Sequence, residues 1–366
     1  MPRSRTVVAL ALLALAACGD QHSAAPPPDP RVAGPYPVGV TTVTFVDPAR
    51  NRPLRTEIWY PAAESARGLP PSPITEFDAV LAPLLSGSTV PLTAVRDAPI
   101  SPHAPFPLVA FSHGNGGVRF QNTFQTERLA SHGFVVVAPD HTGNTILDLG
   151  ADPNPTESRP LDISFLYDEL SADAAEPGGR FEGWVDTTHP FGVTGHSLGS
   201  FTSLAVASAD ARVAAALPMA APGPVAPSYR AATFLMLATE DKTIEEDLNQ
   251  LVRVVYQSLP GPRWLGEVVD AGHYSFTIAC LTGSGLGDGD GCGEGTRFSD
   301  GSRFTFTPAE AVWEIVDVYS VALFGRYLKG IEEYDATLSE NVAPDILRLM
   351  SDPRPELTLL AAPGAP

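Results

Sequence analysis

The sequence predicts an α/β fold, in which a mostly parallel central sheet carries helices on both faces. Short apolar runs alternate along the chain with stretches whose apolar residues recur every three or four positions. Most of the apolar runs are continuous, which is typical of strands buried on both faces of a parallel sheet. The chain has 366 residues, long for one domain but within the range of single α/β domains.

The first residues predict export. Arg3 and Arg5 precede an apolar run over 7–15, too short to cross a bilayer, and the small residues that follow end at Cys18. The LAAC sequence resembles the lipobox of bacterial lipoproteins, in which cleavage leaves the cysteine as the acylated first residue. We therefore expect a signal peptide over 1–17 and a cell-envelope protein anchored to the membrane through Cys18.

The remaining chain divides by composition. Residues 18–37 are rich in proline and alanine, as expected of a tether between a lipid anchor and a folded body. We assign 38–366 to one α/β domain. Two segments fall outside its strand–helix alternation: a proline-rich insertion over 62–105 and a Gly/Asp-rich loop over 281–303.

The expected elements follow in chain order. The first two strands should pair with each other, and later strands should alternate with amphipathic or small-residue helices. Strands are expected at 41–46, 54–61, 107–117 (ending in glycines), 134–140, 191–195, 213–220 and 233–241, and helices at 122–133, 163–170, 197–210, 245–259 and 308–330.

Charge and cysteine content exclude some functions. The chain has 23 Lys and Arg against 42 Asp and Glu, a net charge of −19, with no basic cluster, which argues against nucleic-acid binding. Gly114, Gly116 and Gly117 do not complete a dinucleotide fingerprint, because the sixth position is Arg119. With the first cysteine lipidated, Cys280 and Cys292 are the remaining pair, and an exported protein should join them as a disulfide.

The sequence FGVTGHSLGS contains the pattern G-x-S-x-G at Ser197, between an apolar strand and a helix of small residues. In a parallel α/β sheet this pattern forms a nucleophile elbow, a tight turn that lifts the serine side chain above the sheet. Small residues two positions before and after the serine allow the backbones of the strand and the helix to approach closely at this turn. We therefore expect Ser197 to be a nucleophile.

A serine nucleophile needs a base, and the base needs an orienting acid. In this class of fold the order along the chain is serine, acid, histidine, and His273 is the only histidine after Ser197. The acid should follow a strand between them, where Asp241 is preferred and Glu240 is the rival. Asp270 is too close to His273 in sequence to be attractive.

Two backbone N–H groups should stabilise the oxyanion. One is that of Leu198, directly after the nucleophile, and the other comes from the loop FSHGNGG, where Asn115 is the expected donor. His113 in the same loop is expected to brace the turn by a hydrogen bond rather than take part in the chemistry.

The Gly/Asp-rich loop carries Asp288, Asp290 and Glu294, which raises the question of a calcium site. An EF-hand loop needs an acid at its fifth position and glutamate at its twelfth, where this chain has Cys292 and Ser299. We therefore expect a solvated acidic loop, and neither a metal nor an organic cofactor.

Several motifs together resemble one family. EIWYPA, PLVAFSHGNGG, RPLDISFLYDEL, GVTGHSLGS, ATEDKTI and GHYSFT occur in an order similar to that of platelet-activating-factor acetylhydrolase and dienelactone-hydrolase-like esterases of the α/β-hydrolase superfamily. The spacing of Ser197, Asp241 and His273 also resembles cutinase-like polyester hydrolases. The chain departs from dienelactone hydrolase, whose nucleophile is cysteine, and from the acetylhydrolases, whose acid follows the preceding strand.

The resemblance implies a serine hydrolase that cleaves carboxylic esters through an acyl-enzyme, and the N-terminal sequence adds that it is exported and lipid-anchored. A small ester, a phospholipid or a polyester could be the substrate, because pocket walls formed by the 62–105 insertion cannot be placed from sequence. The rival hypotheses are a non-catalytic surface lipoprotein that keeps the fold, and a peptidase on the same fold.

Overall fold

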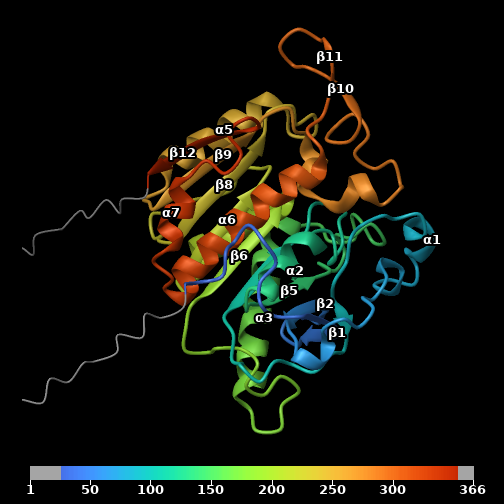
Figure 1. Cartoon of the computed structure of the whole chain (residues 1–366), viewed down its shortest axis with the longest axis vertical. Helices are drawn as coiled ribbons and strands as arrows, with labels where there is room; N and C mark the ends of the chain where they lie inside the picture. The colour runs from blue at the N-terminus through green and yellow to red at the C-terminus, as the bar shows by residue number, and fades with distance from the viewer. Residues whose placement is uncertain (1–25, 353–366) are drawn as a thin grey trace, which may run out of the picture.

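The computed structural model describes residues 26–352, which form a large central sheet with helices on both faces (Figure 1). The strand order is β12-β9-β8-β7-β6-β4-β5-β2-β1-β3. The strands are β1 (Val38–Asp47), β2 (Arg52–Pro61), β3 (Val95–Arg96), β4 (Leu108–Ser112), β5 (Val135–Pro139), β6 (Phe191–His196), β7 (Val213–Met219), β8 (Ala232–Ala238), β9 (Arg263–Val268) and β12 (Leu347–Asp352).

Six neighbouring strands, from β9 through β8, β7, β6 and β4 to β5, run parallel. Antiparallel pairs close the sheet: β2 lies against β5 and β1 against β2, and β12 lies against β9 at the other edge. The expected α/β class and the pairing of the first two strands are confirmed.

The helices cover the two faces of the sheet. They are α1 (Ala82–Leu85), α2 (Thr123–Ser131), α3 (Pro155–Ala175), α4 (Leu198–Ala209), α5 (Glu245–Ser258), α6 (Ala309–Lys329) and α7 (Tyr334–Ser339). The apolar residues of α2 and α6 share one buried core, and those of α3, α4 and α5 share the other. Alternate residues of β4 enter the two cores, with Val109 in the first and Leu108 in the second, because successive strand side chains point to opposite faces.

Several elements differ from the sequence-based expectation: β9, β12 and α7 were not predicted, and α3 has a different start. Strand β9 was not predicted because Glu267 interrupts its apolar run, and the structure pairs this carboxylate with Arg253 of α5 at 2.6 Å. Helix α3 begins eight residues earlier than expected, because its first turns bury ions rather than apolar groups. Asp162 is fully buried there and accepts two hydrogen bonds from the Arg52 guanidinium, at 2.8 and 2.9 Å.

The proline-rich N-terminal segment packs on the folded body from Pro28 onward. The Pro28 carbonyl accepts from Tyr334, and the Val32 carbonyl lies 2.9 Å from Nε2 of His132. These part-buried contacts hold the segment against the body, so the tether prediction is wrong for this part of 18–37. The predicted signal peptide over 1–17 and the lipidated Cys18 lie outside the described residues.

The two segments outside the alternation also have structure of their own. The 62–105 insertion contains α1 and β3, and β3 pairs with β1. The Gly/Asp-rich loop ends in a hairpin of β10 (Glu294–Thr296) and β11 (Arg303–Thr305), which projects from the body in Figure 1. Among residues 26–352, no helix is long and apolar enough to span a bilayer.

Candidate active site

Four parallel strands end at the edge of the sheet where the predicted site residues gather. Asn115 follows β4, Ser197 follows β6, Asp241 follows β8 and His273 follows β9. Because carboxyl ends of parallel strands meet at one edge of a sheet, residues far apart in sequence become neighbours there.

Ser197 sits at a sharp turn between β6 and α4. Its backbone has φ 58° and ψ −120°, a conformation that L-residues rarely adopt. A side chain on Gly199 would place its Cβ 1.8 Å from the carbonyl oxygen of Ser112, and one on Gly195 would reach 2.4 Å from the oxygen of Gly199. The two glycines of G-x-S-x-G are therefore required by the close approach of three backbone segments.

His273 and Asp241 form a buried pair. Nδ1 of His273 lies 2.7 Å from Oδ2 of Asp241, and the other carboxylate oxygen accepts from the backbone N–H groups of Thr243 and Ile244 at 3.0 and 2.9 Å. Asp241 is fully buried and His273 is 3% exposed. A carboxylate held by two N–H groups beside an imidazole can fix the ring's tautomer and orientation.

The rival acids point elsewhere. Glu240 accepts from Lys242 at 3.1 Å and from the backbone N–H of Phe298 at 2.8 Å. Asp270 forms two hydrogen bonds with the guanidinium of Arg297, at 2.5 and 2.9 Å. Of the three acids considered, the structure brings Asp241 to the imidazole.

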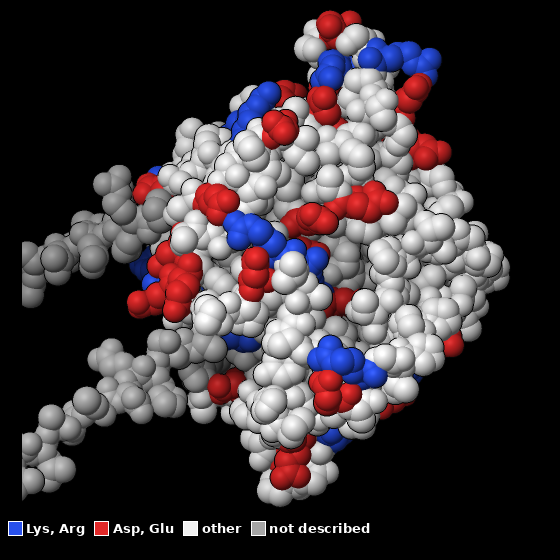
Figure 2. Space-filling model, in the orientation of Figure 1, with Lys and Arg blue, Asp and Glu red and all other residues white. Residues whose placement is uncertain are grey.

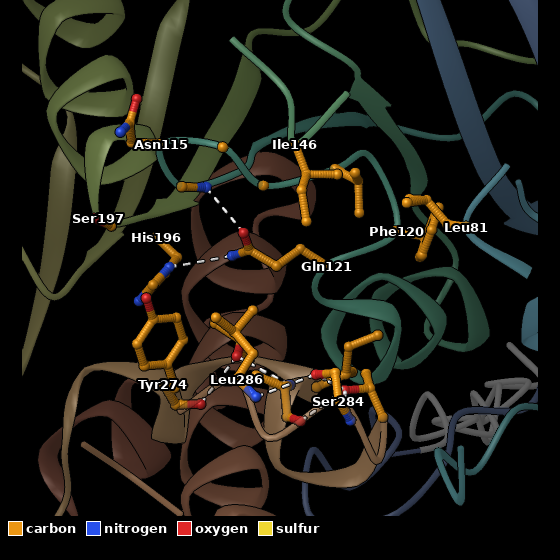
Figure 3. A pocket seen from close by; sticks show the side chains of 18 of the residues that line it. Leu81, Asn115, Phe120, Gln121, Ile146, His196, Ser197, Tyr274, Ser284 and Leu286 are labelled. Carbon is orange, nitrogen blue, oxygen red and sulfur yellow. Dashed lines mark hydrogen bonds between the residues drawn. The ribbon is translucent and has the colours of Figure 1, made fainter. Parts of the chain in front are cut away.

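Ser197, His273 and Asn115 line one cavity of about 380 Å³. Figure 3 shows Ser197 and Asn115 on one side of it, with Leu81, Phe120 and Ile146 on the other. The insertion contributes part of the wall, as expected, through three leucines around α1. Within the described residues no Lys, Arg, Asp or Glu lines the cavity.

The loop after β4 keeps the backbone N–H of Asn115 free. The N–H of Gly114 donates to Gln121 at 3.0 Å, and that of Gly116 donates to the carbonyl of Asn144 at 3.3 Å. Among residues 26–352 no acceptor is found for the N–H of Asn115. Leu198 begins α4, and a first helical residue has no partner for its N–H within the helix.

His113 braces this loop. Its Nε2 accepts from the backbone N–H of His141 at 3.1 Å, so Nδ1 carries the proton and donates to the Gly114 carbonyl at 2.7 Å. Burial lowers its pKa well below the usual value, helped by the charge of Arg159. The bracing role is the one the sequence predicts.

Two residues beside the predicted site, His196 and Gln121, were not identified from the sequence. Nε2 of His196 lies 3.0 Å from the carbonyl oxygen of His273, so this nitrogen is the donor and Nδ1 accepts from the Gln121 amide at 3.1 Å. The oxygen of Gln121 accepts from Gly114, as Figure 3 shows. A chain of hydrogen bonds thus joins the histidine loop to the loop of Asn115.

This series of hydrogen bonds requires the imidazole of His196 to be neutral. Burial lowers the pKa of His196 well below its usual value, and the neighbouring His273 lowers it further. The position of His196 beside the serine could have drawn attention to it. No sequence pattern points to Gln121, because its role depends on contacts 75 residues apart.

The Gly/Asp-rich loop lies against the histidine loop. The predicted disulfide between Cys280 and Cys292 is confirmed, with the Cα atoms 5.3 Å apart. The expectation of a wholly solvated loop is wrong for Asp290, which is 9% exposed and accepts from the backbone N–H of His273 at 2.9 Å. Asp288 and Glu294 are exposed. Within the described residues no group of three or more His, Cys, Asp or Glu side chains is arranged to hold a metal.

Two family models match overlapping parts of the chain. One, described as platelet-activating factor acetylhydrolase, isoform II, matches residues 28–148, and one described as PET hydrolase-like matches 104–284. A solved structure of a ferulic acid esterase from Streptomyces cinnamoneus is similar with a TM-score of 0.61 and 24% identity, over 84% of this chain and 93% of that one. The likeness to that structure extends over nearly the whole fold.

The chain belongs to the α/β-hydrolase superfamily.

Two curated α/β-hydrolase relatives are similar over shorter segments. Platelet-activating factor acetylhydrolase of Cavia porcellus is 32% identical over 124 residues, which cover 31% of this chain and 28% of the relative. Cutinase est2 of Thermobifida alba is 31% identical over 178 residues, which cover 48% of this chain and 55% of the relative. The matches thus span about half or less of each curated relative.

Proposed function

We propose that this α/β-hydrolase is a serine esterase that cleaves carboxylic esters through an acyl-enzyme. One observation carries the proposal: Ser197, in its strained elbow, shares a cavity with His273, whose imidazole is held 2.7 Å from the buried Asp241. A serine, an imidazole and a buried carboxylate in these positions form the groups needed for nucleophilic acyl transfer.

Each residue has a defined role in the proposed reaction. The hydroxyl oxygen of Ser197 attacks the acyl carbon while Nε2 of His273 takes its proton, and Asp241 stabilises the imidazolium. The N–H groups of Asn115 and Leu198 hold the oxyanion. The imidazolium then protonates the leaving alcohol, and water, deprotonated by the same histidine, releases the carboxylic acid and regenerates the serine.

Loss of the nucleophile tests the proposal directly. Ser197→Ala should abolish hydrolysis of p-nitrophenyl butyrate and labelling by a fluorophosphonate, while thermal unfolding stays cooperative, because removal of the nucleophile costs several orders of magnitude in kcat. Ser200→Ala is a matched control three residues later, where the hydroxyl donates to the Ala221 carbonyl. A label that attaches to another serine would contradict the assignment, as would full activity of Ser197→Ala.

The cavity walls favour uncharged, apolar esters. Four of the lining side chains, Leu84, Ile146, Leu149 and Leu286, are more than half exposed at its mouth. The surface around α1, where the first of them lies, carries few charged side chains in Figure 2. Exposed apolar side chains that gather around one opening are typical of a binding surface.

This apolar rim supports a second candidate function, hydrolysis of aggregated or polymeric esters. Val80 and Leu147 are 69% and 52% exposed and extend the rim without lining the cavity. Val80→Asp combined with Leu147→Asp should slow hydrolysis of an emulsified triacylglycerol and leave soluble p-nitrophenyl acetate unaffected. Val254→Asp, at an exposed position of α5, is the control. Equal losses on both substrates would argue against an interfacial role.

We also propose that the protein is exported and anchored through Cys18. The support is the sequence alone: two arginines, a short apolar run and the LAAC motif. Cys18→Ala should release the protein from the membrane fraction of a bacterial host that processes lipoproteins, because acyl chains supply the anchoring energy. Continued sedimentation with membranes would point to another anchor.

A further inference from the structure

The Gly/Asp-rich loop brings one carboxylate to the meeting point of two loops of the site. Asp290 lies between the disulfide partners Cys280 and Cys292 and follows a turn of alternating glycines. Among the described residues, no Lys or Arg side chain forms a salt bridge with it. A nearly buried carboxylate without a cationic partner needs backbone or hydroxyl donors to offset its loss of hydration.

Those donors come from both sides of the acid–base pair. Oδ1 of Asp290 lies 2.9 Å from the backbone nitrogen of His273 and 2.9 Å from that of Lys242, the residue after the acid. Oδ2 accepts from the hydroxyl of Thr243 at 2.8 Å. One oxygen atom therefore links the backbone beside Asp241 to the backbone of the base.

The approach of Asp290 depends on glycine in the histidine loop. A Cβ on Gly272 would lie 2.3 Å from the carbonyl carbon of Asp290. The Asp290 carbonyl also accepts from the backbone N–H of Tyr274 at 3.0 Å. The Asp290 backbone thus packs directly on the chain around His273, and the disulfide closes the loop that holds it there.

We propose that Asp290 is a positioning residue, whose carboxylate holds the Asp241 loop and the His273 loop together so that the acid and the base keep their separation. This inference rests on the proposed esterase function. Asp290 does not line the cavity and touches no reacting atom. Asp290 affects kcat indirectly, by keeping Asp241 and His273 in place, because misplacement of a catalytic group by about 1 Å can lower the rate about 100-fold.

The test is kcat per active site in Asp290→Ala, with the fluorophosphonate label used to count competent sites. The expected result is a 10- to 100-fold lower kcat per labelled site and a slower labelling rate, with KM changed less than about threefold. Asp288→Ala is the matched control, because Asp288 is an exposed acid two residues earlier with no hydrogen bond to either loop. It should behave as wild type.

Three outcomes separate this inference from a purely structural role and from failure of the esterase proposal. If Asp290→Ala reduces only the fraction of labelled sites and leaves kcat per site within about twofold of wild type, the positioning role is wrong. If Asp290→Ala does not fold, Asp290→Asn serves as the test variant, because it retains one oxygen acceptor. Its kcat per labelled site should be a few-fold lower than that of the wild type. A kcat equal to that of Asp288→Asn would overturn the proposal. An unlabelled wild-type protein would contradict the esterase function itself.

Discussion

Asp241 and His273 are 32 residues apart in sequence, yet their side chains meet with Oδ2 2.7 Å from Nδ1. The preceding acid, Glu240, turns toward the hairpin loop and accepts from the backbone of Phe298. The direction of a side chain at the end of β8 therefore distinguishes two adjacent acids that differ little in sequence context.

Asp241→Asn should lower kcat by up to about 10⁴-fold, because an amide beside Nδ1 favours the wrong imidazole tautomer. Steady-state hydrolysis of p-nitrophenyl butyrate measures the effect. Glu240→Gln is the matched control and should change kcat less than about threefold, because its contacts are with Lys242 and Phe298. A larger loss in Glu240→Gln than in Asp241→Asn would transfer the acid role to Glu240.

Gln121→Met should remove both hydrogen bonds that join Gly114 to His196. We expect kcat to fall about tenfold, because the oxyanion loop and the histidine loop lose their connection and the preorganised N–H of Asn115 shifts. Gln125→Met provides the comparison, since this buried glutamine bonds Thr194 and Ser320 outside the cavity. It should lower the melting temperature without lowering kcat per labelled site. Equal kcat in the two variants would contradict the link.

Cys292→Ser opens the disulfide that closes a loop over a sequence separation of 12. The free energy of unfolding should fall by roughly 3 kcal/mol in the chain-entropy model. Because the same loop carries Asp290, kcat should fall more than KM rises. Urea unfolding and steady-state kinetics measure the two effects. Intact-mass analysis after alkylation of the wild type is the control, and two modified thiols without reductant would contradict the bridge in solution.

The contribution of His132 to stability should fall as the pH drops below about 6.5. Burial lowers the pKa of His132 to about 4, so below 6.5 the unfolded state binds a proton that the folded state does not. The unfolded state then gains about 2 kcal/mol at pH 5 from this residue. His132→Gln can still donate to the Val32 carbonyl and should remove this part of the acid sensitivity.

Urea unfolding at pH 7 and pH 5 measures the change in stability between the two pH values. Buried His113, His141 and His196 also have lowered pKa values and add to the acid sensitivity. Burial raises the pKa of Glu127 to about 7, which acts in the opposite direction, so the difference between variant and wild type isolates the contribution of His132. His103→Gln, at an exposed histidine, should leave the pH dependence as in the wild type. A His132→Gln profile that parallels the wild type would contradict the burial argument.

The sequence by itself determined the α/β class, the elbow at Ser197 and the histidine that follows it. The alternation of apolar runs with helical patterns indicates strands buried in a parallel sheet. The pattern G-x-S-x-G indicates a tight turn that only small residues on either side of the serine permit. Both are local properties of the chain. The disulfide was also predictable, because the expectation of export favours oxidised thiols.

Tertiary structure alone decided which polar groups meet. Asp241 faces the imidazole and Glu240 does not, Gln121 bridges two loops, and Asp290 leaves solvent to bind the backbone of His273. The N-terminal segment from Pro28 likewise packs on the body although its composition suggested a tether. Each of these outcomes depends on the direction of a side chain or on a carbonyl brought close by the sheet, and hydrogen bonds act over about 3 Å. Such contacts between distant residues leave no periodic pattern in the sequence.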